Sequence, residues 1–539
     1  NGAAYRNLEQ GSILLGDAAV GMAAYGANSR GLNDGAIKID ARNGAIGMAA
    51  SNGAEVVNNP NNSNGKIDII FKGGKEGDAV IGMYADTGSK AVNYGQINGT
   101  SSKTPVNPDS STDSSFDNVL VGGNEATTIT SANSGAVIGM GVFDFYTGTN
   151  NSAKTVSAEN YGDISLSAGY NSATDVSVNL VGMGSYIDDG FLNGISNPAY
   201  AEQMKLNNYG NIALKYDGVY KVSDTALKLG DGGLIGMRAD ASTEALNRGT
   251  IDIVLTSTEM SADTDVAAGM LSVHGAEITN GTKGAPYNGL NGATGGTIRI
   301  TNEAQSGGVS YGMLAAKGDG TQTKLYQWKA PKVYNYGLID MLTSNSYAMA
   351  SFAGGEVVNN GVINLGYDKG GSFYKNNYGI YGAGGDDTAS ATLVNNGIIN
   401  VYATESTALY NAFAGAVTLE NNGKIYISNK ATNSQALGGN FSEAVNRGLI
   451  EYKVGNSENA GIGGAVGEAG FAPSVAMENA VVTVGDTVNT KQLFVNERAG
   501  EIIIGDVRQA GTDYGGTYVT AGVQVKNQGA ASNDGLIRL

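Results

Sequence analysis

The sequence predicts an all-β protein folded as a right-handed parallel β-helix, a solenoid of about 13–14 coils with loop insertions. Two short motifs that recur together along the chain lead to this prediction. The absence of a competing stretch with helical periodicity supports it. The expected handedness follows the general preference for right-handed crossovers between parallel strands.

The first motif is apolar-x-Asn-x-Gly-x-Ile, as at residues 91–97, 245–251, 357–363 and 444–450. Its period of two predicts a β-strand with the apolar residue, the Asn, the Gly and the Ile on one face. The shortest spacing between copies is too small for a strand–helix–strand unit, so we expect coils of strand and turn. The glycines of the motif are Gly35, Gly65, Gly95, Gly162, Gly210, Gly249, Gly296, Gly337, Gly361, Gly397, Gly423, Gly448, Gly500 and Gly535.

The second motif, Gly-Met, precedes the first by about half a coil, so each coil should contain at least two strand segments. We expect stacked coils to place Met over Met as core, because Met fills irregular space well. Later, degenerate copies have Ile or Leu in place of Met, as at 379–380 and 408–409. The clear copies end in Met22, Met48, Met83, Met140, Met183, Met237, Met270 and Met313.

The Asn of the first motif is predicted to form a structural row at a corner of the coil. An inward-facing Asn is costly alone. In a stack, each amide can donate to the next coil and accept from the previous one. The glycine two positions later permits a tight bend or a positive φ. The asparagines of this row are Asn33, Asn93, Asn160, Asn208, Asn247, Asn335, Asn359, Asn395, Asn421, Asn446 and Asn533.

Composition excludes several classes of protein. The chain has 539 residues and no cysteine, which excludes disulfides, thiol catalysis and Cys-based metal sites. The net charge of −17 argues against nucleic acid and anionic membranes as partners. Solubility of a long solenoid is the simplest explanation of that charge. No run of 18 apolar residues is present.

The repeat covers nearly the whole chain, so residues 1–539 are predicted to form a single β-helical segment. The sequence starts at Asn1 and stops inside a copy of the motif, which favours a segment of a longer β-helix. Polar or aromatic stretches between the copies are expected to be loop insertions. They lie at 98–135, 185–205, 216–231, 276–295, 317–332, 366–387 and 456–495.

Catalytic and metal-binding residues are not expected, and no cofactor is predicted. The single histidine, His274, lies in a strand-like stretch without a nucleophile motif beside it. The outward positions of the first motif carry no repeated carboxylate pair, which argues against a carbohydrate-active enzyme. Asp188–Asp189 and Asp386–Asp387 lack the spacing of known calcium loops.

Binding through aromatic residues on loops is the remaining prediction. Tyr and Trp bring large contact area at low entropic cost, which suits sugar stacking and protein hot spots. One candidate group lies in a lysine-containing loop with the only Trp, and a second lies in a Tyr- and Gly-rich loop. An alternative is that these aromatics merely cover the sides of the solenoid. The candidate residues are Tyr326, Trp328, Lys329, Tyr374, Tyr378 and Tyr381.

The combination of Asn-x-Gly-x-Ile with an intervening Gly-Met-x-Ala, as at 82–85 and 236–239, carries a family resemblance. It resembles the passenger regions of large type V autotransporter surface proteins, and most of all those of fusobacterial outer-membrane adhesins. The resemblance spans essentially the whole chain. It implies extracellular display at the bacterial outer membrane, through a C-terminal β-barrel missing from this sequence, and a role in adhesion and virulence. A monomer is expected.

Three functions remain open at this point. The first is an adhesin segment that binds a host-cell glycan such as a galactose-type sugar, an immune or adhesion receptor, or partner bacteria. The second is a structural spacer that presents a binding tip elsewhere in the parent chain. The third is a carbohydrate-active β-helix enzyme, against which the single His and the missing carboxylate clusters argue.

Overall fold

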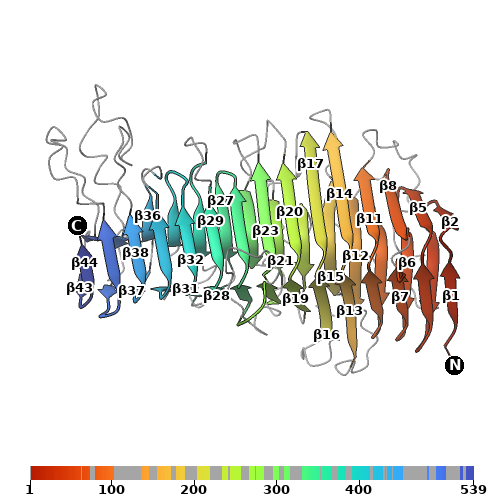
Figure 1. Cartoon of the computed structure of the whole chain (residues 1–539), viewed down its shortest axis with the longest axis horizontal. Helices are drawn as coiled ribbons and strands as arrows, with labels where there is room; N and C mark the ends of the chain where they lie inside the picture. The colour runs from red at the N-terminus through yellow and green to blue at the C-terminus, as the bar shows by residue number, and fades with distance from the viewer. Residues whose placement is uncertain are drawn as a thin grey trace. The chain divides into compact units, whose positions relative to one another are not determined.

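The structure is a computed structural model. It describes residues 2–61, 64–72, 79–101, 135–144, 154–170, 178–187, 203–218, 233–240, 243–255, 266–273, 275–284, 295–302, 309–315, 330–352, 354–366, 374–382, 391–412, 417–428, 431, 434–439, 441–452, 482–484, 493–504, 523–525 and 530–538. Throughout these segments the regular elements are β-strands, labelled in Figure 1. In the described segments, no helix is long and apolar enough to cross a membrane.

The chain divides into two compact units. Unit 1 comprises Asn1–Thr279, Gly296–Val309 and Gly318–Lys329, and unit 2 comprises Asn280–Gly295, Ser310–Lys317 and Ala330–Leu539. Strand β22 (Glu277–Asn280) and strand β24 (Val309–Ala315) run across the division. Within each unit, every strand pairs in parallel with the strand three places further along the chain. Each coil therefore contributes one strand to each of three sheets, here called A, B and C.

Unit 1 is built in this way from the N-terminus onward. Sheet A contains β1 (Ala4–Asn7), β4 (Arg30–Asn33), β7 (Glu55–Asn58), β10 (Lys90–Asn93), β13 (Thr155–Asn160), β16 (Gln203–Asn208) and β19 (Thr243–Asn247). Sheet B contains β2 (Ser12–Leu15), β5 (Ala36–Ala41), β8 (Lys66–Phe71), β11 (Gln96–Ser101), β14 (Asp163–Tyr170), β17 (Asn211–Gly218), β20 (Thr250–Leu255) and β23 (Thr297–Asn302). Sheet C contains β3 (Val20–Tyr25), β6 (Ala45–Ser51), β9 (Ala79–Asp86), β12 (Gly135–Asp144), β15 (Val178–Ile187), β18 (Leu234–Ala239) and β21 (Val266–Ser272).

Unit 2 repeats the same scheme. Its sheet A contains β25 (Lys332–Asn335), β28 (Gly355–Asn359), β31 (Ala391–Asn395), β34 (Thr418–Asn421), β37 (Glu443–Asn446), β40 (Leu493–Asn496) and β43 (Ala530–Asn533). Its sheet B contains β26 (Leu338–Leu342), β29 (Val362–Leu365), β32 (Ile398–Val401), β35 (Lys424–Ile427), β38 (Leu449–Tyr452), β41 (Glu501–Ile504) and β44 (Leu536–Arg538). Its sheet C contains β24, β27 (Ser346–Ser351), β30 (Tyr378–Gly382), β33 (Thr407–Asn411), β36 (Gln435–Gly439), β39 (Val482–Val484) and β42 (Val523–Val525).

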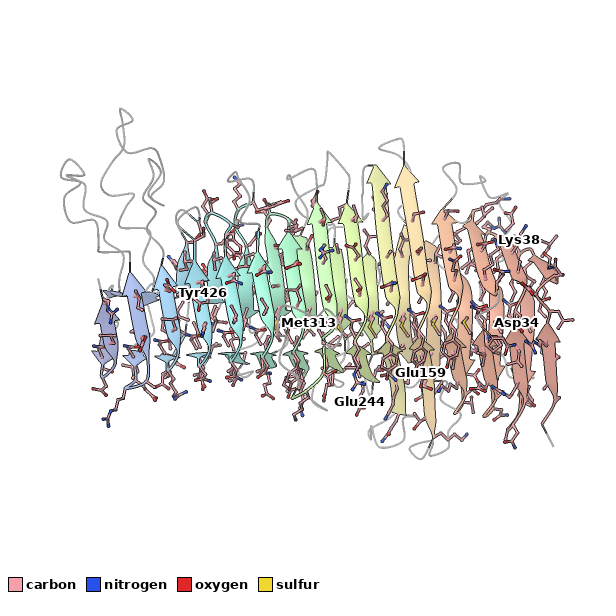
Figure 2. The ribbon with its side chains drawn as sticks, in the orientation of Figure 1. Asp34, Lys38, Glu159, Glu244, Met313 and Tyr426 are labelled. Atoms are coloured by element: carbon pink, nitrogen blue, oxygen red, sulfur yellow. The ribbon has the colours of Figure 1, made fainter. Side chains whose placement is uncertain are left out.

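The predicted fold class is confirmed, since the described residues form an all-β, parallel β-helical solenoid with three strands in a coil. The register places like residues over like. In sheet C, Met83 pairs with Met48 and with Met140. These side chains are buried, as is Met313, which lies among the ribbons of unit 2 (Figure 2). Sulfur and apolar side chains therefore form the core between the three sheets, as the repeated Gly-Met predicts.

The first motif is not one strand, and this corrects the sequence-based prediction. It contains two strands of different sheets, because β10 ends at Asn93 and β11 begins at Gln96. Tyr94 and Gly95 form the bend between sheets A and B. An apolar residue before the bend and an isoleucine after it both face the core, which explains why the pattern keeps a period of two across the bend.

The glycine of the bend serves a close approach between coils, and Gly95 and Gly162 show how. Neither of them has a positive φ, so the positive φ expected as one possible reason for this glycine does not occur at these two positions. A Cβ atom added to Gly162 would lie 2.1 Å from the carbonyl oxygen of Gly95 in the preceding coil. A Cβ on Gly95 would lie equally close to the oxygen of Gly65. Glycine is therefore required because backbone meets backbone at the corner.

Several of the expected insertions overlap strands. Strand β11 extends to Ser101 within 98–135, and β17 extends to Gly218 within 216–231. In 366–387, residues 378–382 form β30 of sheet C, so this segment is not a continuous loop as expected. Most of the other residues of the insertions lie outside the described residues, as do His274, Asp188–Asp189 and Asp386–Asp387.

Candidate functional site

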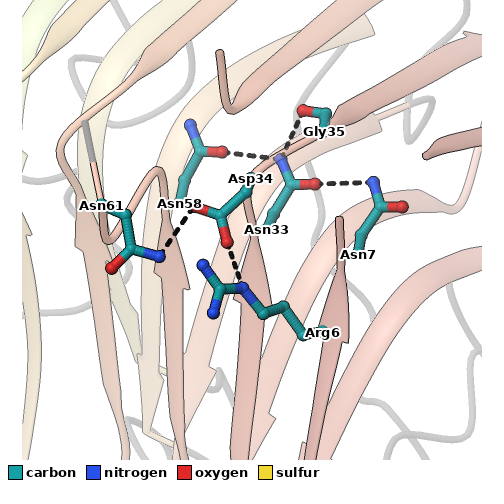
Figure 3. A network of polar contacts seen from close by, with 7 residues as sticks. All are labelled: Arg6, Asn7, Asn33, Asp34, Gly35, Asn58 and Asn61. Atoms are coloured by element: carbon teal, nitrogen blue, oxygen red, sulfur yellow. Dashed lines mark hydrogen bonds and ion pairs between the residues drawn. The ribbon is translucent and has the colours of Figure 1, made fainter. Parts of the chain in front are cut away.

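The asparagines of the corner form hydrogen-bonded rows through the interior. In unit 1, the Nδ2 of Asn33 donates to the Oδ1 of Asn58 at 2.8 Å and to the carbonyl oxygen of Gly35 at 3.2 Å (Figure 3). The Oδ1 of Asn33 accepts from the Nδ2 of Asn7 at 2.8 Å. The same donor–acceptor step continues from Asn58 to Asn93, Asn160, Asn208 and Asn247.

Unit 2 has its own row with the same polarity, in which each Nδ2 donates to the Oδ1 of the next coil. It runs through Asn280, Asn335, Asn359, Asn395, Asn421, Asn446, Asn496 and Asn533. Four members of the rows were not predicted from the sequence, namely Asn7, Asn58, Asn280 and Asn496. At these four positions extra residues separate the Asn from its glycine, which obscures the spacing. All members except the terminal Asn7 and Asn533 are buried, and we assign the rows to the scaffold.

Aromatic side chains gather on sheet C of unit 2, and we call this group the aromatic surface. Its members are Tyr311, Tyr347, Phe352, Tyr378, Tyr381 and Tyr410. Tyr311 is 4% exposed, whereas the other five are partly exposed. They come from β24, β27, β30 and β33, and from the residue that follows β27. Four successive coils therefore supply one surface.

The rings stand in two stacked columns. In the first, Tyr347 stacks on Tyr311 and on Tyr378, with both pairs of ring centroids 5.2 Å apart. In the second, Tyr381 stacks on Tyr410 with centroids 5.8 Å apart. The columns meet edge to face, with Tyr381 only 4.5 Å from Tyr347 at an angle of 64°. Stacked and T-shaped pairs each stabilise such a cluster by about 0.5–1.5 kcal/mol beyond area burial.

Register explains why these rings meet. Tyr347 pairs with Tyr311 on one side and with Tyr378 on the other, and Tyr381 pairs with Tyr410. A residue at the same register position in neighbouring parallel strands lies one strand spacing away, about 4.8 Å. A tyrosine repeated at one position of the coil therefore forms a stacked column through strand register alone.

Raised pKa values keep the hydroxyls of Tyr311, Tyr347, Tyr378 and Tyr381 protonated at neutral pH. Burial, with smaller contributions from the neighbouring Tyr410 and Tyr347, raises the pKa of Tyr378 to about 12. Burial likewise raises the pKa of Tyr311 and of Tyr381 above the usual value. The hydroxyl of Tyr378 donates to the Oδ1 of Asn376 at 3.2 Å. The surface thus combines apolar ring area with neutral hydrogen-bonding groups.

A polar group borders the second column. Tyr410 is in register with Gly438, and a Cβ atom on Gly438 would lie 2.5 Å from the Oε1 of Gln435 and 3.5 Å from the Tyr410 ring. The amide of Gln435 and the ring of Tyr410 therefore share the space above this glycine. Gln435 is partly exposed. At this end of the column, an aromatic ring therefore lies beside a side-chain amide.

The candidate residues from the sequence fall into two groups. Tyr326, Trp328 and Lys329 lie outside the described residues. Tyr378 and Tyr381 lie on strand β30 within the aromatic surface, and not on a loop as expected. Tyr374 is partly exposed, and its carbonyl oxygen accepts a hydrogen bond from the backbone N–H of Thr404 at 3.0 Å.

Sequence reasoning missed the other four members of the surface, Tyr311, Tyr347, Phe352 and Tyr410. The three tyrosines among them carried a usable signal, because each lies at one of two fixed distances from the Gly-Met position. Tyr311 and Tyr347 each lie two residues before a methionine of the core row. Tyr410 follows Leu409, which takes the place of that methionine.

Unit 1 has a comparable column that is more deeply buried. Tyr84 stacks on Phe143 with ring centroids 4.8 Å apart, and Phe143 stacks on Tyr186 at 5.0 Å. The guanidinium of Arg238 lies 4.6 Å from the centre of the Tyr186 ring and 3.2 Å from the carboxylate of Asp240. Tyr84, Phe143, Arg238 and Asp240 are all buried, so this column supports the fold.

The described segments contain no group of three or more His, Cys, Asp and Glu side chains that could hold a metal ion. The aromatic surface is therefore the strongest candidate site that the described residues provide.

Residues 316–432 match the family model of the BigA fourth domain, a domain family of bacterial surface proteins of adhesin type. No curated protein and no solved structure matches the chain. Five of the six residues of the aromatic surface lie inside the matched segment, and Tyr311 lies just before it. The part of this chain that is similar to an adhesin-type domain is thus the part that carries the aromatic surface.

Proposed function

We propose that the chain is an adhesin segment displayed on a bacterial surface, in which the β-helix is a rigid scaffold and the aromatic surface contacts a protein on another cell. The gathering of six aromatic side chains on one sheet of unit 2 is the observation that carries this proposal. Partly exposed tyrosines held rigid by their neighbours resemble the anchors of protein interfaces, which lose little side-chain entropy on binding.

The orientation of the rings favours a protein over a sugar as partner. A pyranose ring binds an aromatic side chain by lying against the face of that ring. In the first column, the faces of Tyr347 are occupied by Tyr311 and Tyr378, because the ring planes lie within 13° of parallel. The edges and hydroxyl groups of such rings remain to face a partner. Edges and hydroxyls suit the mixed apolar and polar patches of a folded protein.

A glycan is the second candidate, and one observation favours it. The end of the second column places the ring of Tyr410 beside the amide of Gln435. An aromatic ring next to an amide offers both an apolar face and hydrogen bonds to a saccharide. A host-cell or bacterial surface sugar would then bind at this end of the surface, independently of the stacked faces elsewhere.

The spacer function stays as a third proposal. Under it, the aromatic surface only covers sheet C, and recognition lies elsewhere in the parent protein. The fold and the adhesin-type family of the matched segment favour a non-catalytic surface protein in all three cases.

Binding of the purified chain to mammalian cells and to partner bacteria separates these proposals. Binding should be lost after mild protease treatment of the cells and should persist with excess galactose and N-acetylgalactosamine. Inhibition by either sugar, with protease-treated cells still bound, would favour the glycan at Tyr410 and Gln435. Absence of binding by this chain, when the full parent protein binds, would favour the spacer function.

A further inference from the structure

A second aromatic column lies on the outside of unit 1, where the bend between sheets A and B carries a tyrosine in three successive coils. Tyr161 stacks on Tyr209 with ring centroids 4.7 Å apart and on Tyr94 at 5.0 Å. The ring planes are within 16° of parallel. We call Tyr94, Tyr161 and Tyr209 the tyrosine ridge. The guanidinium of Arg248 lies 5.8 Å from the Tyr209 ring and ends the column.

The backbone holds these rings in place. The N–H of Tyr161 donates to the carbonyl oxygen of Asn93, and the N–H of Tyr209 donates to that of Asn160, both at 2.7 Å. The buried asparagine row lies directly beneath, with Asn93, Asn160 and Asn208 in register. The three phenols are therefore fixed at the spacing of the coils.

Exposure sets the ridge apart from the other stacked tyrosines. Tyr94 is 45% exposed and Tyr161 is 43% exposed, and Tyr209 is partly exposed. In the aromatic surface of unit 2, Tyr311 and Tyr347 stack at a similar distance, but Tyr311 is buried. A dissolved oxidant or an oxidising enzyme therefore reaches Tyr94 and Tyr161 more readily than the buried Tyr311.

We propose that the tyrosine ridge is an oxidative cross-linking site, at which a peroxide-dependent haem peroxidase joins Tyr161 to Tyr209, and secondarily to Tyr94, through a carbon–carbon bond. The cross-link is a dityrosine, formed within one molecule and between neighbouring coils. The proposed adhesin function does not require this cross-link, and the two proposals are tested independently.

The chemistry balances with hydrogen peroxide as the terminal oxidant. The peroxidase removes one electron from each of two tyrosines, and each phenol loses its hydroxyl proton to give a phenoxyl radical. The two radicals couple between ring carbons ortho to oxygen, and each ortho hydrogen then moves to oxygen to restore the phenol. The pair loses two electrons and two protons, which reduce one peroxide to two waters.

Glu159 acts as the proton acceptor for the first step at Tyr161. The hydroxyl of Tyr161 donates to the Oε2 of Glu159 at 3.2 Å, and the Nζ of Lys90 lies 2.9 Å from the Oε1 of the same carboxylate. A phenol that loses an electron becomes strongly acidic, so a hydrogen-bonded carboxylate takes its proton without a separate diffusion step. We therefore expect Tyr161 to be oxidised first and to couple to whichever neighbour is oxidised next.

The consequence is a covalent staple in a chain without cysteine. Tyr94 and Tyr161 belong to consecutive coils whose asparagines are separated by 67 residues in sequence. A cross-link between distant positions restricts the unfolded chain and so stabilises the folded coils, as a disulfide does. The cross-linked chain should unfold at higher denaturant concentration than the untreated chain.

The test treats the purified full chain with a haem peroxidase and hydrogen peroxide, followed by proteolysis and mass spectrometry. We expect a monomer lighter by two hydrogens, dityrosine fluorescence, and a cross-linked peptide pair that contains Tyr161. The Tyr161→Phe variant keeps the stacked ring and should reduce the yield to background. Tyr347→Phe is the matched control in the stacked column of unit 2, and its yield should equal that of the unsubstituted chain.

A third variant tests the proton acceptor. Glu159→Gln keeps a hydrogen-bond acceptor but removes the base, and should slow formation of the cross-link while leaving its position unchanged. The proposal is overturned if no dityrosine forms, if it forms only between different molecules, or if Tyr161→Phe leaves the yield unchanged. Cross-links that map only to other tyrosines would overturn it as well.

Discussion

The side-chain amide of Asn93 donates to the side-chain oxygen of Asn160 at 2.8 Å, although 67 residues separate them in sequence. Both side chains are fully buried. The intervening residues include a long insertion, yet the register of sheet A is the same as between coils without one. The contact between two side chains of one residue type thus fixes where each new coil begins on the previous one.

Replacement of Asn160 by Ala should destabilise unit 1. It leaves the donor of Asn93 and the acceptor of Asn208 without their buried partner. Each buried unsatisfied group costs about 1–3 kcal/mol, so a loss of about 2–6 kcal/mol is expected. Unfolding in denaturant, followed by tyrosine fluorescence, measures the loss. Asn533→Ala is the control, because Asn533 ends the row of unit 2 and is exposed; it should cost much less.

Replacement of Gly162 by Ala should disturb the corner of the coil. The new Cβ would lie 2.1 Å from the carbonyl oxygen of Gly95, and backbone cannot yield there without breaking the stacking of coils. We expect a lower unfolding midpoint and faster hydrogen exchange in β13 and β14. Gly16→Ala provides the control, because its Cβ would meet no atom within 4 Å. An unchanged midpoint for Gly162→Ala would show that the close approach is not required.

Replacement of Arg238 by Met should be costly because it removes a buried cation. The Arg238 guanidinium lies 3.2 Å from the Asp240 carboxylate, and the two side chains are 10% and 3% exposed. Removal of one partner from a buried ion pair costs about 3–5 kcal/mol. Arg238→Lys keeps the charge and should recover part of the loss. Equal stability of Arg238→Met and the unsubstituted chain in chemical denaturation would contradict the assignment of this column to the scaffold.

The stability of unit 1 should depend on pH through Asp86. Burial raises the pKa of this carboxyl above its ordinary 3.8, against the opposing effect of hydrogen bonds such as that from Ser51. A raised pKa means that the folded state binds the proton more tightly than the unfolded state. The contribution of Asp86 to the stability of the folded state is therefore fully present below pH 3.8. It is lost as the pH rises through the pKa that Asp86 has in the folded chain.

The Asp86→Asn variant does not titrate, and it keeps an acceptor for the hydroxyl of Tyr84, which lies 2.6 Å from the carboxylate. Its free energy of unfolding relative to the unsubstituted chain should increase as the pH rises from below 3.8 to neutral. Denaturant titrations across that range measure the difference. A difference that stays constant with pH would show that Asp86 has the same pKa in the folded and unfolded chains.

Much of the scaffold could be predicted from the sequence, because a stacked solenoid repeats its contacts. The recurrence of Asn-x-Gly and Gly-Met is sufficient to predict parallel coils, the core methionines and a row of asparagines. The sequence analysis could not predict three strands in each coil, since the bend at Tyr94–Gly95 keeps an alternating pattern across two sheets. It also missed Asn58 and Asn280, because insertions separate them from their glycines.

The candidate site was less predictable, and the tyrosines show why. Tyr378 and Tyr381 were recognised only as aromatics of an expected loop. Their partners Tyr311 and Tyr410 lie in other coils, at sequence distances that the insertions make irregular. Only the register of sheet C tells which tyrosines stack, and register depends on where each insertion ends. The local sequence pattern therefore does not reveal which residues of different coils lie in register.

The most direct test of the central claim compares two pairs of stacked tyrosines in cell binding. Tyr381→Ala/Tyr410→Ala alters the aromatic surface, and Tyr94→Ala/Tyr161→Ala alters a comparable stacked pair in unit 1. Folding of both variants is first verified by circular dichroism. The first pair should weaken binding to target cells by about tenfold or more, as loss of interface anchors does. Equal affinity of the two variants would contradict the claim that the aromatic surface of unit 2 makes the contact.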